Sequence, residues 1–142
     1  MCQARHEDIL REQRYRRQSQ SATRMSLLSS FRHAFRGLGL VLACERNARI
    51  HLTAAVAALA AALWLGLDHA ELALVTVTIA LVLAAELVNT IVERLVDLVH
   101  PDHSESVRAI KDVSAGVVLI TALGALAVAG LLFLPRLVDA WR

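Results

Sequence analysis

The residues best placed to do chemistry lie in the stretch ELVNTIVERLVD, residues 86–97. On a helix that advances about 100° per residue, Glu86, Glu93 and Asp97 fall within about 40° of one another. Asn89 lies about 60° from Glu86, so four polar side chains share one side of the helix. Ionisable groups at membrane depth are usually functional. This face is therefore a candidate functional site, although the residues alone do not choose a reaction.

Two charged clusters could join these carboxylates: CERNARIH, residues 44–51, and RAIKD, residues 108–112. Carboxylates with interspersed cations suit Mg²⁺ plus a polyphosphate, because Mg²⁺ takes one or two carboxylates and completes its octahedron with phosphate oxygens and water. The alternative is interfacial anchoring, with snorkelling bases and solvated acids. Spacing alone leaves both interpretations open. The residues that would meet if the helices bundle are Glu45, Glu93 and Asp112, with Arg49, Arg108 and Lys111 nearby.

Several other kinds of site are not supported by the sequence. No glycine-rich loop precedes Lys111, the only lysine, so a nucleotide site here would lack a P-loop. The two cysteines have no partners at zinc spacing and cannot make a framework of several disulfides. HPDH, residues 100–103, is more typical of an exposed turn than of a metal site. The basic run in the first 24 residues has only Tyr15 as an aromatic, so we expect no nucleic-acid partner.

The elements that must position these residues are membrane helices. Of the 142 residues, 56% are hydrophobic and 4% aromatic. Three stretches lack any charged side chain, residues 52–67, 72–85 and 113–135. The third is long enough to span a bilayer unaided, and the second reaches that length only by including Glu86. A charge at that depth costs about 2.5–3.5 kcal/mol, so such groups are usually functional, although packing against a polar partner remains the alternative.

The sequence predicts an all-α membrane protein with its N-terminus in the cytoplasm. Residues 1–51 hold ten bases and the 93–112 connection three, whereas the 68–71 link holds none. We expect a charged, disordered tail over residues 1–25 and a single membrane domain over 26–142. Apolar residues at spacings of three and four predict an amphipathic surface helix over 26–44. Transmembrane helices are expected over about 48–67, 71–97 and 108–134. So thin a bundle is expected to form a homo-oligomer.

Four motifs, in order, resemble the small integral-membrane diacylglycerol kinase family of bacteria, which includes undecaprenol kinase. They are SFRHAFRGLGL, ERNARIH, ELVNTIVE with its trailing VD, and KDVSAGVVL, and the resemblance covers residues 26–133. It implies a surface helix and three transmembrane helices in a homotrimer with shared active sites in the inner membrane. It also implies transfer of the ATP γ-phosphate to a membrane lipid hydroxyl with Mg²⁺.

The resemblance also assigns roles to residues. Glu86 takes the place of the general base, with Asn89 as the motif asparagine. Glu45 and Glu93 take the positions of the metal-coordinating acids. The remaining positions are His33, Asp102, Lys111 and Asp112 for the nucleotide, and Arg49 and Ala115 for the substrate region.

This sequence departs from the family pattern in two places. The loop that usually reads Pro, acid, Tyr, His keeps only Pro101 and Asp102, which puts its adenine contacts in doubt. Serines, Ser26 and Ser29, also stand where some members have a basic residue early on the surface helix.

The leading hypothesis is an ATP-dependent lipid kinase that acts on diacylglycerol, giving phosphatidic acid, or on undecaprenol, giving undecaprenyl phosphate. The alternative is a small oligomeric proton-coupled transporter with Glu86 as the proton carrier. A structural membrane subunit without chemistry is a third interpretation, under which Glu86→Gln would affect stability alone.

Overall fold

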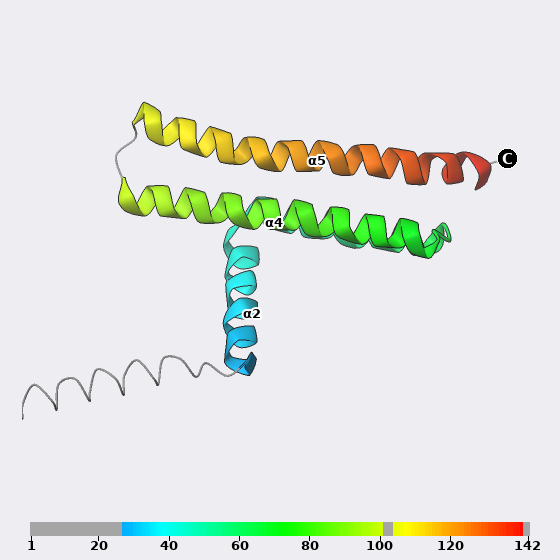
Figure 1. Ribbon diagram of the computed structural model, residues 1–142, viewed down its shortest axis with the longest axis horizontal. Helices are drawn as coiled ribbons and strands as arrows, with labels where there is room; N and C mark the ends of the chain where they lie inside the picture. Colours follow the sequence, from blue (N-terminus) through cyan, green and yellow to red (C-terminus); the bar gives the residue numbers. More distant parts are fainter. Residues whose placement is uncertain (1–26, 101–103, 141–142) are drawn as a thin grey trace, which may run out of the picture. The chain divides into compact units, whose positions relative to one another are not determined.

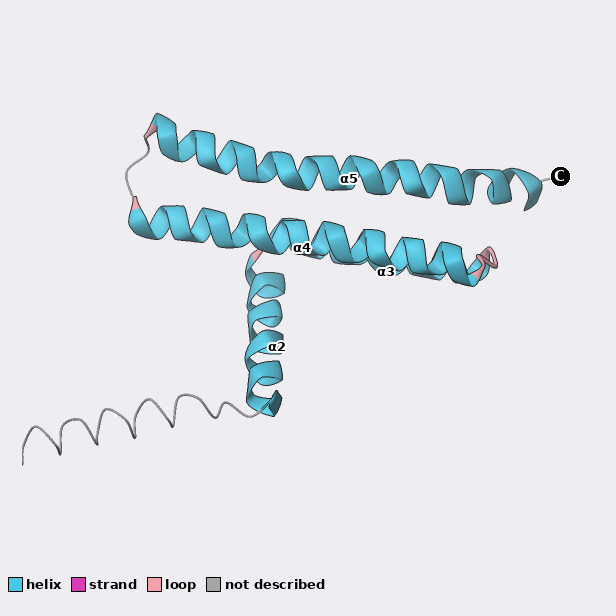
Figure 2. Ribbon diagram, in the orientation of Figure 1, coloured by secondary structure: helices cyan, strands magenta, loops and turns pink. Residues whose placement is uncertain are grey.

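The computed structural model describes residues 27–100 and 104–140, and within them the chain is helical apart from short connections (Figures 1 and 2). The four helices in these ranges are α2 (Leu27–Cys44), α3 (Arg46–Trp64), α4 (His69–Val99) and α5 (Glu105–Ala140). No strand occurs in the described ranges, which confirms the predicted all-α class. The predicted tail, residues 1–25, lies outside them.

The chain divides into two compact units between Leu40 and Val41, so most of helix α2 belongs to the first unit. None of its 18 residues is buried, and Phe31 and Phe35, one turn apart, are 61% and 69% exposed. Its interfacial placement in a membrane stays a prediction.

Helices α3, α4 and α5 are each long and apolar enough to cross a membrane, as the charge-free stretches predicted. Helix α5 begins three residues before the predicted span and continues six residues beyond it, past Pro135. Val107 is its only buried residue among those described. The rest of α5 therefore presents a long apolar surface, which is stable when lipid or another protein chain covers it.

Helix α4 is the central element, because both α3 and α5 pack against it (Figure 1). Helix α3 buries small residues seven positions apart, namely Ala48, Ala55 and Ala62. Helix α4 buries Val75, Val82 and Asn89 at the same interval. A seven-residue repeat is typical of left-handed helix packing, and alanines let the two backbones approach closely.

The turn between α3 and α4 is specified locally. Gly66 has a positive φ of 66° and ends α3, with its N–H donating to the Leu63 carbonyl at 3.2 Å. Asp68 then caps α4: the Glu71 N–H donates to Asp68 Oδ1 at 2.9 Å, and the Asp68 N–H donates to Glu71 Oε2 at 2.8 Å. This reciprocal capping box fixes where α4 begins.

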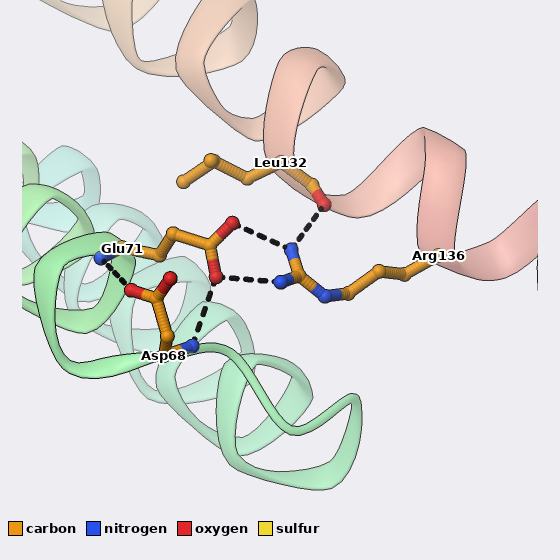
Figure 3. Close-up of polar contacts among 4 residues, drawn as sticks. All are labelled: Asp68, Glu71, Leu132 and Arg136. Atoms are coloured by element: carbon orange, nitrogen blue, oxygen red, sulfur yellow. Dashed lines mark hydrogen bonds and ion pairs between the residues drawn. The ribbon is translucent and has the colours of Figure 1, made fainter.

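Glu71 also joins α4 to α5 (Figure 3). The Arg136 guanidinium donates to Glu71 Oε1 at 2.9 Å and to Oε2 at 2.6 Å, and also to the Leu132 carbonyl at 3.3 Å. The two side chains are 31% and 23% exposed. A bidentate contact of this kind fixes the relative orientation of the two side chains as well as their separation. It therefore holds α5 to α4 at the end of the bundle that contains the α3–α4 turn, which we call the turn end.

We expect Arg136→Leu to lower the free energy of unfolding by about 1–2 kcal/mol, because charge-assisted hydrogen bonds are lost in a partly exposed setting. The unfolding free energy of Arg136→Lys should lie between those of the wild type and Arg136→Leu, since lysine keeps the positive charge but cannot make the two parallel hydrogen bonds. Unfolding in detergent micelles, followed by circular dichroism, measures this. The control is Asp139→Asn, an exposed position on the same helix. Equal stability of Arg136→Leu and the control would contradict the assignment.

Candidate active site

Buried polar residues cluster on the second half of α4. Glu86, Asn89 and Thr90 are 3%, 6% and 3% exposed, whereas the other buried residues of the described chain are hydrophobic. Burial of polar groups in an apolar bundle is costly unless they are paired or serve a ligand. This part of α4 lies toward the end of the bundle that contains the α4–α5 connection, which we call the site end.

Asn89 is the centre of a hydrogen-bonded group. Its Nδ2 donates to Glu93 Oε1 at 3.0 Å, one turn further along α4. Its Oδ1 accepts from Ser114 Oγ of α5 at 2.6 Å. The asparagine therefore orients Glu93 and binds α4 to α5 through the same amide group.

Ion pairs surround this group at the site end. Arg94 Nη2 lies 2.9 Å from Glu45 Oε1, which joins the start of α3 to α4. Lys111 Nζ lies 2.5 Å from Asp97 Oδ1, which joins α5 to α4. Each pair brings one residue predicted for the site, Glu45 or Lys111, against a partner that was not assigned a role.

Glu86 differs from Asn89 because its carboxylate, like the Thr90 hydroxyl, makes no hydrogen bond or ion pair with any described residue. The titratable groups close enough to act on it are His51, Glu93 and Glu45. A buried carboxylate without a partner has acceptor capacity for a ligand group. It is the part of the cluster most open to chemistry.

An apolar cavity of about 410 Å³ lies between the three long helices. Its wall comes from residues 50–58 of α3, 75–83 of α4 and 122–133 of α5. Val82 and Leu83 line it, and Glu86 follows them by one helical turn on the same face of α4. The cavity therefore ends beside the buried carboxylate, with the hydrogen-bonded group further toward the site end.

The structure brings some of the predicted site residues together and leaves others apart. Glu86, Asn89 and Glu93 share one face of α4 as the periodicity predicted, and Glu45 and Lys111 reach that helix through their ion pairs. Three predicted residues are exposed on the single chain and do not contact this group: Arg49, Asp112 and Ala115. Asp112 Oδ2 instead lies 3.9 Å from Arg108 Nε on its own helix. His33 lies on the separately described α2, and Asp102 lies outside the described residues.

The structure adds four residues to those predicted: His51, Arg94, Asp97 and Ser114. Asp97 had a signal, since it falls on the same helical side as Glu86. Ser114 stands in the KDVSAGVVL motif, and His51 ends the ERNARIH motif. The contacts of Arg94 and Ser114 cross between helices, so spacing within one helix gave no indication of these two residues.

The carboxylates fit part of a magnesium site. Among the described residues, no three His, Cys, Asp or Glu side chains form a cluster that could hold a metal ion. Mg²⁺ needs only one or two carboxylates where phosphate oxygens and water supply the other ligands. The Oε2 atom of Glu93 has no partner among the described residues and could bind a metal ion directly. The Glu45 carboxylate would first have to break its ion pair with Arg94. The donor set therefore suits a metal that arrives with a phosphate.

The sequence is similar to known proteins over most of its length. Residues 32–133 match the family model for prokaryotic diacylglycerol kinase. The chain is 41% identical over 115 residues to a diacylglycerol kinase of Synechocystis sp., covering 80% of this chain and 66% of that protein. It is 35% identical over 108 residues to the undecaprenol kinase of Bacillus subtilis, covering 76% of this chain and 88% of that protein.

We expect Ser114→Ala to lower the free energy of unfolding by about 1–2 kcal/mol, because it leaves the buried Asn89 Oδ1 without its donor. Ser114→Thr retains the hydroxyl and should lose less. Unfolding in detergent, with the exposed Ser106→Ala of the same helix as control, measures the difference. A Ser114→Ala protein as stable as the control would rule out a structural contribution from this hydrogen bond.

Proposed function

The chain belongs to the prokaryotic diacylglycerol kinase family, as its four motifs predicted, and we propose that it is a multi-pass membrane lipid kinase. It transfers the γ-phosphate of ATP to the hydroxyl of a membrane lipid, either diacylglycerol or undecaprenol. The observation that supports this most directly is the apolar cavity that ends beside Glu86. Hydrocarbon fits the cavity, and a hydroxyl at its end meets a carboxylate that has no other partner.

Glu86 is the general base in this proposal. The lipid oxygen attacks the γ-phosphorus while the hydroxyl proton passes to the Glu86 carboxylate. The bond between the γ-phosphorus and the oxygen that bridges it to the β-phosphate breaks, and ADP leaves. Because a free alcohol is a weak nucleophile, a positioned carboxylate contributes about 10²–10⁴-fold to the rate.

The nucleotide binds at the site end, next to Asn89. Lys111 would leave Asp97 to bind phosphate oxygens, and Glu45 would leave Arg94 to hold the metal that accompanies them. Glu93, held by Asn89, supplies a second carboxylate. Bound Mg²⁺ would neutralise charge on the transferred phosphoryl group. His33, Asp102 and Asp112 remain proposed nucleotide contacts.

A homotrimer with shared active sites accounts for the exposed members of the predicted set. Arg49, Asp112 and Ala115 have no contact with Glu86 within one chain and would acquire a function beside a neighbouring subunit. The exposed apolar side of α5 provides surface that such neighbours and lipid would cover.

The proposed location is the bacterial inner membrane, with the site end and the N-terminus in the cytoplasm. Arg136 is the one Lys or Arg of the described part of the bundle at the turn end, and the others lie at the site end: Arg46, Arg49, Arg94, Arg108 and Lys111. This asymmetry follows the positive-inside rule and supports a nucleotide site on the side of the membrane where ATP is present.

Turnover should require a lipid alcohol, Mg²⁺ and Glu86. We expect Glu86→Gln to lower kcat by about 10²–10⁴-fold, because the amide cannot accept the hydroxyl proton, while Mg·ATP binding is kept. ATP consumption in mixed micelles with undecaprenol, diacylglycerol or no lipid measures this. The control is Glu105→Gln, an exposed carboxylate of α5.

Two outcomes would count against the proposal in different ways. Substantial activity in Glu86→Gln would remove its role as base. Folded wild-type protein that is inactive with both lipids, and that conducts protons in vesicles, would favour the transporter instead.

Glu45→Gln and Glu93→Gln should each raise the Mg²⁺ concentration needed for half-maximal activity by about tenfold, because one charged ligand is lost. Titration of activity with Mg²⁺ at saturating lipid measures the effect. Arg94→Met is the matched control, since it breaks the Glu45 ion pair but leaves the carboxylate. An unchanged Mg²⁺ dependence, or an equal shift in Arg94→Met, would show that Glu45 is no metal ligand.

A further inference from the structure

The wall of the cavity contains two polar side chains, His51 of α3 and Thr78 of α4. The Thr78 hydroxyl is already used, because it donates to the Leu74 carbonyl of its own helix at 2.7 Å. The half-buried His51 imidazole makes no hydrogen bond or ion pair with any described residue. His51 is therefore the polar group of the wall that is free to bind something inside the cavity.

His51 lies at the same end of the cavity as Glu86. It precedes the buried, cavity-lining Ala55 by one turn of α3, and Glu86 follows the cavity-lining Val82 by one turn of α4. These two helices are antiparallel, so both residues continue their lining faces toward the site end. His51 is also among the titratable groups that act on Glu86, yet the two are not paired with each other.

The two groups have complementary hydrogen-bonding capacity. An ionised carboxylate only accepts, whereas an imidazole has at least one N–H that donates. A hydroxyl placed between them satisfies both, because it donates its proton to one and accepts from the other. An ether or ester oxygen would satisfy the imidazole alone.

We propose that His51 is a substrate-positioning residue, whose imidazole N–H donates a hydrogen bond to the oxygen of the lipid hydroxyl that faces Glu86. The inference rests on the lipid kinase function proposed above. An apolar wall gives a hydrocarbon chain no fixed depth, because its contacts are not directional. One hydrogen bond at the end of the cavity sets that depth and places the oxygen for attack.

The test compares two substitutions at this position. His51→Leu removes the donor at similar volume, and His51→Gln keeps an N–H donor. We expect His51→Leu to lower kcat/KM for the lipid alcohol by about tenfold and to leave KM for Mg·ATP unchanged. His51→Gln should restore most of the loss. The control is His69→Leu, an exposed histidine at the turn end of α4.

A second measurement uses the wild-type protein, so it does not depend on the variants folding. The methyl ether of the lipid accepts from His51 but has no proton for Glu86, and the deoxy lipid does neither. We expect the ether to inhibit at about a fivefold lower concentration than the deoxy lipid. Unchanged kinetics in His51→Leu, or equal inhibition by the two analogues, would overturn the assignment. A rise in KM for Mg·ATP in His51→Leu would move His51 to the nucleotide site. Absence of lipid-dependent turnover in wild type would instead be a failure of the proposed function.

Discussion

A polar group inside an apolar helix bundle has no water to bind, and the arrangement of this protein depends on that constraint. Two half-buried threonines meet it within their own helices: Thr78 donates to the Leu74 carbonyl at 2.7 Å and Thr121 to the Val118 carbonyl at 2.9 Å. Asn89 meets it across helices, through Ser114 and Glu93. Glu86 and His51 have no such partner among the described residues. Their unmet hydrogen-bonding capacity at the end of the cavity is what distinguishes the candidate site from the rest of the bundle.

The same constraint explains how α5 is held. Val107 is its one buried residue in the described ranges, and Leu132 and Phe133 pack half-buried against the core near the turn end. Polar contacts fix it at both ends as well: Lys111 and Ser114 at the site end, and Arg136 at the turn end. Two widely separated points of attachment define the register of α5 along α4, so the placement of Lys111 next to the candidate nucleotide site depends on both.

The sequence was sufficient to predict what depends on one helix at a time. Absence of charge identified the three spans, and angular spacing placed Glu86, Asn89 and Glu93 on one face. Contacts between helices were not predictable, because the sliding of one helix along another is set by packing that periodicity does not encode. The bidentate contact of Arg136 is an example, since Arg136 lies beyond residue 134, where the predicted span ended. Pro135 instead stands inside α5, and the helix continues to Ala140.

The size of the cavity limits what the protein can distinguish in a lipid. At about 410 Å³ it lies near the lower end of pockets that hold drug-sized molecules, which run from about 300 to 1,000 Å³. In the proposed kinase it would hold the carbons next to the hydroxyl, and the remainder of a long tail would stay among the bilayer lipids. The described lining of the cavity would then not contact the far part of the tail, and lipids that share a head group and its first carbons would be equivalent substrates. Such a kinase would select its substrates among the membrane lipids by the chemistry of their head groups. The tail lengths of its products would be those set by the enzymes that make the lipids.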